Sequence, residues 1–122
     1  MSAAPAIADW TTGVEAIVYQ CCAFCGGRQY FRRRFCVACG APDPVDKAAS
    51  GRGTVYAASL VVRAATPEAR AHVPYNIVLV DAAEGFRMMG HGDNDLKIGE
   101  RVTARWSRFT NRLVPYFTRT TS

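Results

Sequence analysis

The sequence predicts a mainly β protein in two parts, a small four-cysteine zinc ribbon followed by a five-stranded barrel of the OB type. Two observations predict this class. Two Cys-x2-Cys pairs stand ten residues apart, and after residue 50 short apolar and β-branched runs alternate with turns rich in glycine and proline. Short strands in series without a long helical pattern are typical of a small barrel. An SH3-like barrel is the structural alternative.

The chain divides into four segments by composition. Residues 1–15 are expected to form a lead-in with a short helical turn, since Pro5 stands near its start. The zinc ribbon is expected over residues 16–42 and opens with a short apolar strand at 16–20. Two prolines and the lack of a periodic apolar pattern predict a linker over 43–50. The OB-fold barrel is then expected over residues 51–122.

Five runs are predicted to supply the barrel strands. They lie at 54–63, 75–81, 86–91, 101–109 and 113–118. The run at 75–81, YNIVLVD, is nearly continuous in apolar residues, which predicts a strand buried on both faces. Closure into a barrel removes most of the exposed strand edges that five short strands would otherwise leave.

The two cysteine pairs predict one tetrahedral metal site formed by Cys22, Cys25, Cys36 and Cys39. Two residues between ligands allow one tight turn to present both sulfurs to the same ion, and glycine follows each pair. Four thiolates leave no open position for water or substrate, so the predicted zinc is structural. Iron in the same four thiolates is the alternative. Cys21 has the wrong spacing to Cys25 and is interpreted as a bystander.

Composition narrows the remaining function classes. The 122 residues are 49% hydrophobic and 20% charged, which excludes general disorder. No apolar run is long enough to span a membrane, and the N-terminus lacks the pattern of a secretory signal, so a cytoplasmic protein with reduced thiols is expected. The net charge is +5, and of 15 basic residues only Lys47 and Lys97 are lysine. Arginine suits phosphate and carboxylate recognition, although a GC-rich genome produces the same bias.

Binding is a better interpretation than catalysis. His72 and His91 stand on separate predicted loops, and neither accompanies a nucleophile motif, so no enzyme acting alone is expected. Basic residues alternate with aromatic ones in the ribbon, and a second basic group covers the last two strands. Such surfaces suit single-stranded nucleic acid or a nucleotide-like cofactor equally well, and a solvated face is the alternative. The second group consists of Arg101, Arg105, Arg108, Arg112 and Arg119.

At this point several stretches together resemble a bacterial and archaeal family. That family joins a rubredoxin-like zinc ribbon to an OB-fold and is associated with acyl-CoA metabolism. Family members usually carry prolines where this chain has Arg32 and Arg33, which leaves the metal ligands untouched. The matching stretches are QCCAFCG (20–26), YFRRRFCVACG (30–40), GRGTVY (51–56), PYNIVLV (74–80), Glu84-Gly85, LKIGERV (96–102) and VPYFT (114–118).

The resemblance implies a non-catalytic accessory subunit of a thiolase-superfamily enzyme, either a thiolase or a lipid-transfer-type aldolase. It implies a hetero-oligomer with that catalytic subunit, structural Zn²⁺, and CoA or acyl-CoA as a ligand shared with the partner. Membrane association and nucleic acid are not expected. Two alternatives are a single-stranded nucleic-acid-binding protein and a free-standing acyl-CoA carrier or thioester-acting enzyme. From charge and the shared loops, the residues expected to bind CoA or another anion are Arg28, Arg32, Arg33, Arg34 and Arg52.

Overall fold

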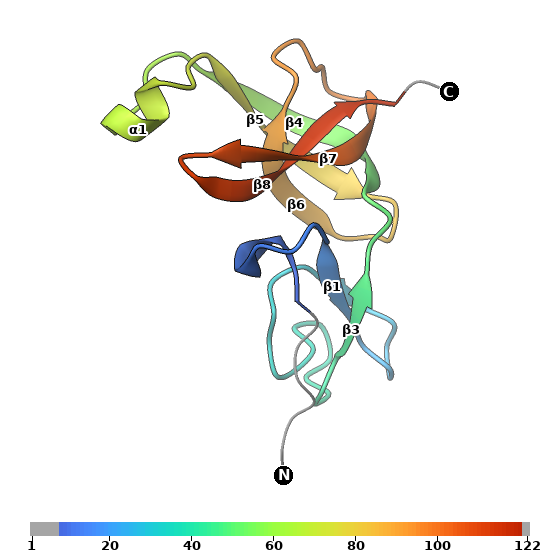
Figure 1. Cartoon of the computed structure of the whole chain (residues 1–122). Coiled ribbons are helices and arrows are strands. Elements are labelled where there is room, and N and C mark those ends of the chain that lie inside the picture. The colour runs from blue at the N-terminus through green and yellow to red at the C-terminus, as the bar shows by residue number, and fades with distance from the viewer. Residues whose placement is uncertain (1–7, 121–122) are drawn as a thin grey trace.

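The computed structural model describes residues 8–120, and residues 1–7 of the predicted lead-in lie outside them. Figure 1 shows a small ribbon packed against one end of a barrel. The predicted helical turn is present as the short 3-10 helix η1 (Trp10–Thr12), which is capped by the side chain of Asp9. The ribbon sheet has the order β2-β1-β3. Its strands are β1 (Val18–Cys21), β2 (Arg28–Gln29) and β3 (Val45–Ala48).

The barrel is closed and has the strand order β4-β5-β6-β8-β7, with β7 returning to pair with β4. All pairs are antiparallel except β6 with β8, which is parallel. This is the Greek-key order of an OB-fold, as the sequence predicted. The strands are β4 (Arg52–Val61), β5 (Tyr75–Ala82), β6 (Arg87–Gly92), β7 (Arg101–Phe109) and β8 (Arg112–Arg119). One short helix, α1 (Pro67–Arg70), lies between β4 and β5.

The segment predicted to be a linker contains strand β3. This strand pairs antiparallel with β1 over four residues, from Cys21 opposite Val45 to Val18 opposite Ala48. Because β1 is the central strand of the ribbon, its second edge needs backbone hydrogen-bond partners, and β3 supplies them. Its side chains are mostly exposed, so the strand leaves no apolar pattern in the sequence. The segment 43–50, predicted as a linker between ribbon and barrel, therefore includes a strand of the ribbon sheet.

Strand β5 is not buried on both faces. Val78 and Val80 point into the barrel and are fully buried, whereas Ile77 and Leu79 alternate with them and are only partly covered. An antiparallel barrel of this size has nothing layered over its outer wall, so a continuous apolar run need not mean two covered faces. The outer face of β5 is half-exposed instead.

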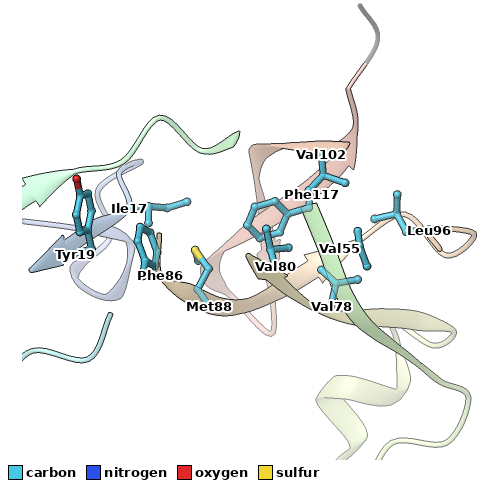
Figure 2. Packing of buried hydrophobic residues seen from close by; sticks show 10 residues of the cluster. All are labelled: Ile17, Tyr19, Val55, Val78, Val80, Phe86, Met88, Leu96, Val102 and Phe117. Carbon is cyan, nitrogen blue, oxygen red and sulfur yellow. The ribbon is translucent and has the colours of Figure 1, made fainter. Parts of the chain in front are cut away.

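The hydrophobic core runs without a break from the ribbon into the barrel. Figure 2 shows Ile17 and Tyr19 of the ribbon beside Phe86 and Met88, which lead on to the valines of the barrel. Leu96, in the loop after β6, is 5% exposed and ends the core on the far side. The residues of this core are Ile17, Tyr19, Val55, Val78, Val80, Phe86, Met88, Leu96, Val102 and Phe117.

Phe86 joins the two parts of the molecule. Its ring stacks on Tyr19 at a centroid distance of 4.8 Å and lies nearly parallel to Tyr30 at 5.7 Å. Tyr30 also accepts a 2.8 Å hydrogen bond from the indole nitrogen of Trp10 in η1. The barrel residue is thus held between two ribbon tyrosines, with Gly85 allowing the tight turn before it through a φ of 94°.

Replacing Phe86 by alanine is expected to lower the free energy of unfolding by about 3–5 kcal/mol, because a buried ring and its two stacking contacts are lost. Urea unfolding followed by tryptophan fluorescence measures this. Met89→Ala on the same strand is the matched control, since Met89 is 56% exposed, and it is expected to change stability by less than about 0.5 kcal/mol. Equal effects of the two variants would contradict the assigned role of Phe86.

Candidate functional site

The structure brings the four predicted cysteines together. Their Sγ atoms all lie within 4.8 Å of one another, with 3.7 Å between Cys22 and Cys39 and 3.6 Å between Cys25 and Cys36. A tetrahedron with zinc–sulfur distances of about 2.3 Å has edges of about 3.8 Å. The donor set therefore fits a metal ion such as zinc. Cys21 is outside this cluster and packs against the core instead.

The two cysteine turns share one backbone design. In the first, the amide of Gly26 donates to the carbonyl of Cys22 at 3.0 Å, and in the second Gly40 donates to Cys36 at 2.8 Å. Both glycines have positive φ, 74° and 79°, a conformation that other residues rarely adopt. The same turn occurs twice because each must direct two sulfurs and several amides toward one point.

Backbone amides set the acidity of the thiols. Hydrogen bonds from the amides of Cys25 and Phe24 lower the pKa of Cys22 to about 6, and those of Cys39 and Ala38 lower the pKa of Cys36. The pKa of Cys25 is raised to about 12. The hydrogen bond from the amide of Gly27 lowers this pKa, but the contacts with the other three sulfurs together raise it by more than that. Without a cation the cluster therefore retains protons, and a bound metal ion has to displace them.

Two glutamines that sequence reasoning missed hold the second cysteine turn in place. Gln29 accepts from the amide of Val37 at 3.0 Å and donates to the side chain of Gln20 at 2.8 Å. Gln20 is 5% exposed and also bonds both the amide and the carbonyl of Arg33, at 2.8 and 3.0 Å. The one signal for this role in the sequence was the position of Gln20, a polar residue that ends the apolar run before Cys21.

The predicted anion-binding arginines fall into two groups. Arg28 and Arg52 flank the turn before β6: the Arg28 side chain lies against Gly85, and the Arg52 carbonyl accepts from Ala83 at 2.9 Å. Arg32, Arg33 and Arg34 lie on the ribbon loop, all exposed. Arg32 approaches Asp46 of β3 at 3.8 Å. Their binding of an anion stays a prediction.

The second basic group is also divided. Arg119 is held by Glu100, at 2.6 Å, and by Asp95, at 3.7 Å, so much of its charge is balanced locally. Arg101, Arg105, Arg108 and Arg112 are exposed on β7 and β8.

The two histidines, His72 and His91, were expected on separate loops. The structure brings both into contact with the ring of Phe109, at centroid distances of 4.6 and 4.5 Å. Tertiary pairing of three distant segments produces this contact.

Apart from the cysteines, residues 8–120 contain no group of three or more His, Cys, Asp or Glu side chains arranged to hold a metal ion. Within the same range no helix has both the length and the apolar composition needed to cross a membrane.

A four-cysteine ribbon joined to a closed OB barrel defines a specific class of small two-part β protein. Residues 46–107 match the family described as "ChsH2, C-terminal OB-fold domain", and the chain belongs to that family. No curated protein matches the sequence.

Two solved structures are similar to the chain over most of its length. One, described as "Ltp2-ChsH2(DUF35) aldolase", is 25% identical with a TM-score of 0.73, over 87% of this chain and 86% of that one. The other is a DUF35-family protein of unknown function from Sulfolobus solfataricus, 16% identical with a TM-score of 0.56, over 86% of this chain and 76% of that one. The second likeness shows the fold alone.

Cys36→Ser is expected to release the metal and unfold the ribbon, because Cys36 is 2% exposed and supplies one of four ligands. Metal content by mass spectrometry of purified protein, with thermal melting, measures this. Cys21→Ser is the control and should keep full metal. A Cys36→Ser protein with full metal and unchanged melting would exclude the four-thiolate site.

The affinity for Zn²⁺ is expected to rise about tenfold or more per pH unit between about pH 6 and 8. The Cys25 thiol, with its pKa raised to about 12, is protonated throughout this window, so each bound ion displaces at least one proton. Below about pH 6 Cys22 is protonated as well, and the dependence steepens. Competition with a chromophoric chelator measures the affinity, and a pH-independent value would contradict this account.

Proposed function

We propose that this protein is a non-catalytic accessory subunit of a thiolase-type acyl-CoA enzyme, a thiolase or a lipid-transfer-type aldolase, and that it works in the cytoplasm. The similarity to the ChsH2-containing aldolase over 87% of this chain and 86% of that one carries the proposal. That structure's description names two components, Ltp2 and ChsH2, and this chain is similar to a part of that assembly rather than to a self-contained enzyme.

Structural zinc in the four-cysteine site would stabilise the ribbon without taking part in chemistry. Cys22, Cys25, Cys36 and Cys39 would hold it, and four thiolates leave no position for a substrate. The two cysteine turns are thereby kept in one conformation, together with the residues that they carry on their outer surface. The ribbon, with three short strands, is too small to hold these turns by apolar packing alone.

The outer surface of the ribbon is unusually apolar and supports a docking role. Phe24 is 79% exposed, Phe31 74%, Val37 59% and Phe35 50%. Phe24 and Val37 occupy the two cysteine turns, so the metal cluster determines where both are presented. Exposed aromatic groups of this kind mark contact sites in soluble proteins. We assign this ribbon surface, defined by these four residues, to the contact with the catalytic subunit.

The neighbouring arginines would then face the substrate of the complex. Arg33 and Arg34 adjoin Phe35 on the ribbon loop, and Arg28 and Arg52 lie beside the turn at Gly85. Guanidinium groups bind phosphate with two parallel hydrogen bonds, and CoA carries several phosphate oxygens. In this arrangement the accessory subunit positions the CoA end of the thioester, while the partner supplies the catalytic groups.

Recovery of tagged protein from its native cells, with the co-purifying proteins identified by mass spectrometry, tests the proposal. The expected result is a stoichiometric thiolase-like partner for the native chain, and its loss for Phe24→Ser combined with Val37→Ser. Because burial of each side chain contributes about 1.5–3 kcal/mol, the double change should weaken the complex at least a hundredfold.

Ile98→Ser is the matched control, since Ile98 is 72% exposed but lies on a barrel loop. It should retain the partner. Metal content and melting of the double variant separate loss of docking from loss of folding. If no thiolase-like partner is recovered with the native chain and nucleic acid is retained instead, the proposal is overturned.

A further inference from the structure

The barrel carries a cleft that neither the metal site nor the proposed partner contact uses. Its volume is about 470 Å³, and all its lining residues lie between His72 and Tyr116, so no ribbon residue contributes. It is bordered by the end of the loop that follows α1, by β5 and β6, by the loop after β6, and by the parts of β7 and β8 next to the turn that joins them. Figure 1 shows this turn on the same side of the barrel as α1.

Four rings form one wall of the cleft. Tyr75 and His91 are stacked at 5.3 Å with their planes 15° apart. Phe109 contacts both, at 4.7 Å from Tyr75 and 4.5 Å from His91, and His72 also packs on Phe109, at 4.6 Å. The rings hold one another in place before any ligand arrives, so stacking on them would cost little ordering.

The two histidines contribute aromatic surface to this wall. The Nε2 atom of His72 accepts a 3.4 Å hydrogen bond from the amide of Thr110, which helps to fix the orientation of the ring. Burial, with a smaller contribution from His72, lowers the pKa of His91. The lowered pKa favours the uncharged form of His91, and both rings can stack on a planar ligand.

Polar groups of both signs complete the cleft. Asp93 and Asp95 contribute acidic residues to the lining, and Arg108 contributes a basic one. Asp93 interacts with the hydroxyl of Tyr116 and, after burial, is the main reason that the pKa of Tyr116 is raised. Asp95 approaches Arg119 at 3.7 Å, but its side chain is 76% exposed and remains accessible to a ligand.

We propose that this cleft binds a mononucleotide, with its nucleobase stacked on the ring wall, an exocyclic amine of the base donating to the carboxylates, and a phosphate at Arg108. A stacking platform of aromatic rings is the usual way in which OB barrels hold a base, and the loops around the cleft are the ones that such barrels use for ligands. The volume falls in the range of small-molecule sites.

A single nucleotide fits the cleft better than a nucleic-acid strand does. A strand needs a second stacking platform farther along the same face, and there the outward residues of β5 and β6 are Leu79 and Met89, which are aliphatic. The carboxylates of Asp93 and Asp95 would also repel a continuing phosphodiester backbone. The ligand is therefore expected to end within the cleft.

Calorimetric titration of the full chain with AMP tests this proposal. AMP is expected to bind with Kd of about 1 mM or below, and UMP, whose base lacks an exocyclic amine, at least about tenfold more weakly. Phe109→Leu should weaken AMP binding about tenfold or more. Arg108→Gln should weaken binding of AMP but not that of adenosine, and Lys97→Gln, outside the cleft, should change neither.

Three results would overturn the proposal: no AMP binding up to about 10 mM, AMP binding unchanged by both Phe109→Leu and Arg108→Gln, or a single-stranded adenine decanucleotide binding far more tightly through the same residues. If Phe109→Leu fails to fold, the exposed Arg108 still provides the test.

A parallel titration with CoA separates two sources of the same adenosine phosphate. Tighter binding of CoA than of AMP indicates the thioester carrier, and equal binding indicates a free nucleotide. The ribbon and the partner play no part in this test, so its failure leaves the accessory-subunit proposal standing.

Discussion

The insertion of Phe86 between Tyr19 and Tyr30 is the contact on which the rest of the structure depends. It unites the ribbon with the barrel at the first residue after the turn between β5 and β6. The ring is 5% exposed, so its burial contributes about 1.5–3 kcal/mol before stacking is counted. Because η1 bonds Tyr30 through Trp10, the lead-in is secured by the same contact.

This arrangement explains how a ribbon with three short strands keeps a defined conformation. Its apolar surface is completed by the barrel, through Ile17, Tyr19 and Phe86, and its loops are held by the four thiolates. The buried Gln20 and its partner Gln29 connect these two supports, because the glutamines bond the loop that carries the second cysteine turn. The cysteine cluster, the glutamine hydrogen bonds and the aromatic stacking therefore support one short module together.

The two proposed binding surfaces lie on different modules. The ribbon carries exposed aromatic residues on the two cysteine turns, and a metal ion held by the four cysteines would present them in one orientation. The barrel carries a concave cleft between loops, where rings from three segments converge over a closed sheet.

Local chemistry alone made much of this molecule predictable. The spacing of Cys22, Cys25, Cys36 and Cys39 identified the cluster, since two-residue spacers constrain a turn directly. Period-two apolar runs and turn residues located all five barrel strands to within a few residues. The family resemblance rested on the same short stretches, and the match of residues 46–107 to the ChsH2 family agrees with it.

Contacts between distant segments were decided only by the tertiary structure. Strand β3 exists because β1 has an edge to pair, although residues 45–48 are mostly exposed and carry no apolar pattern. Phe86 became the joint because the ribbon folds back onto the barrel, and Gln20 became a buried support because Gln29 and Arg33 of the ribbon fold around it. His72, His91 and Phe109 come from three segments that meet when the barrel closes. The sequence by itself determined where the strands begin and what a single cysteine turn can bind. The closed sheet decided which side chains meet, because these contacts depend on the register between strands that are far apart in the chain.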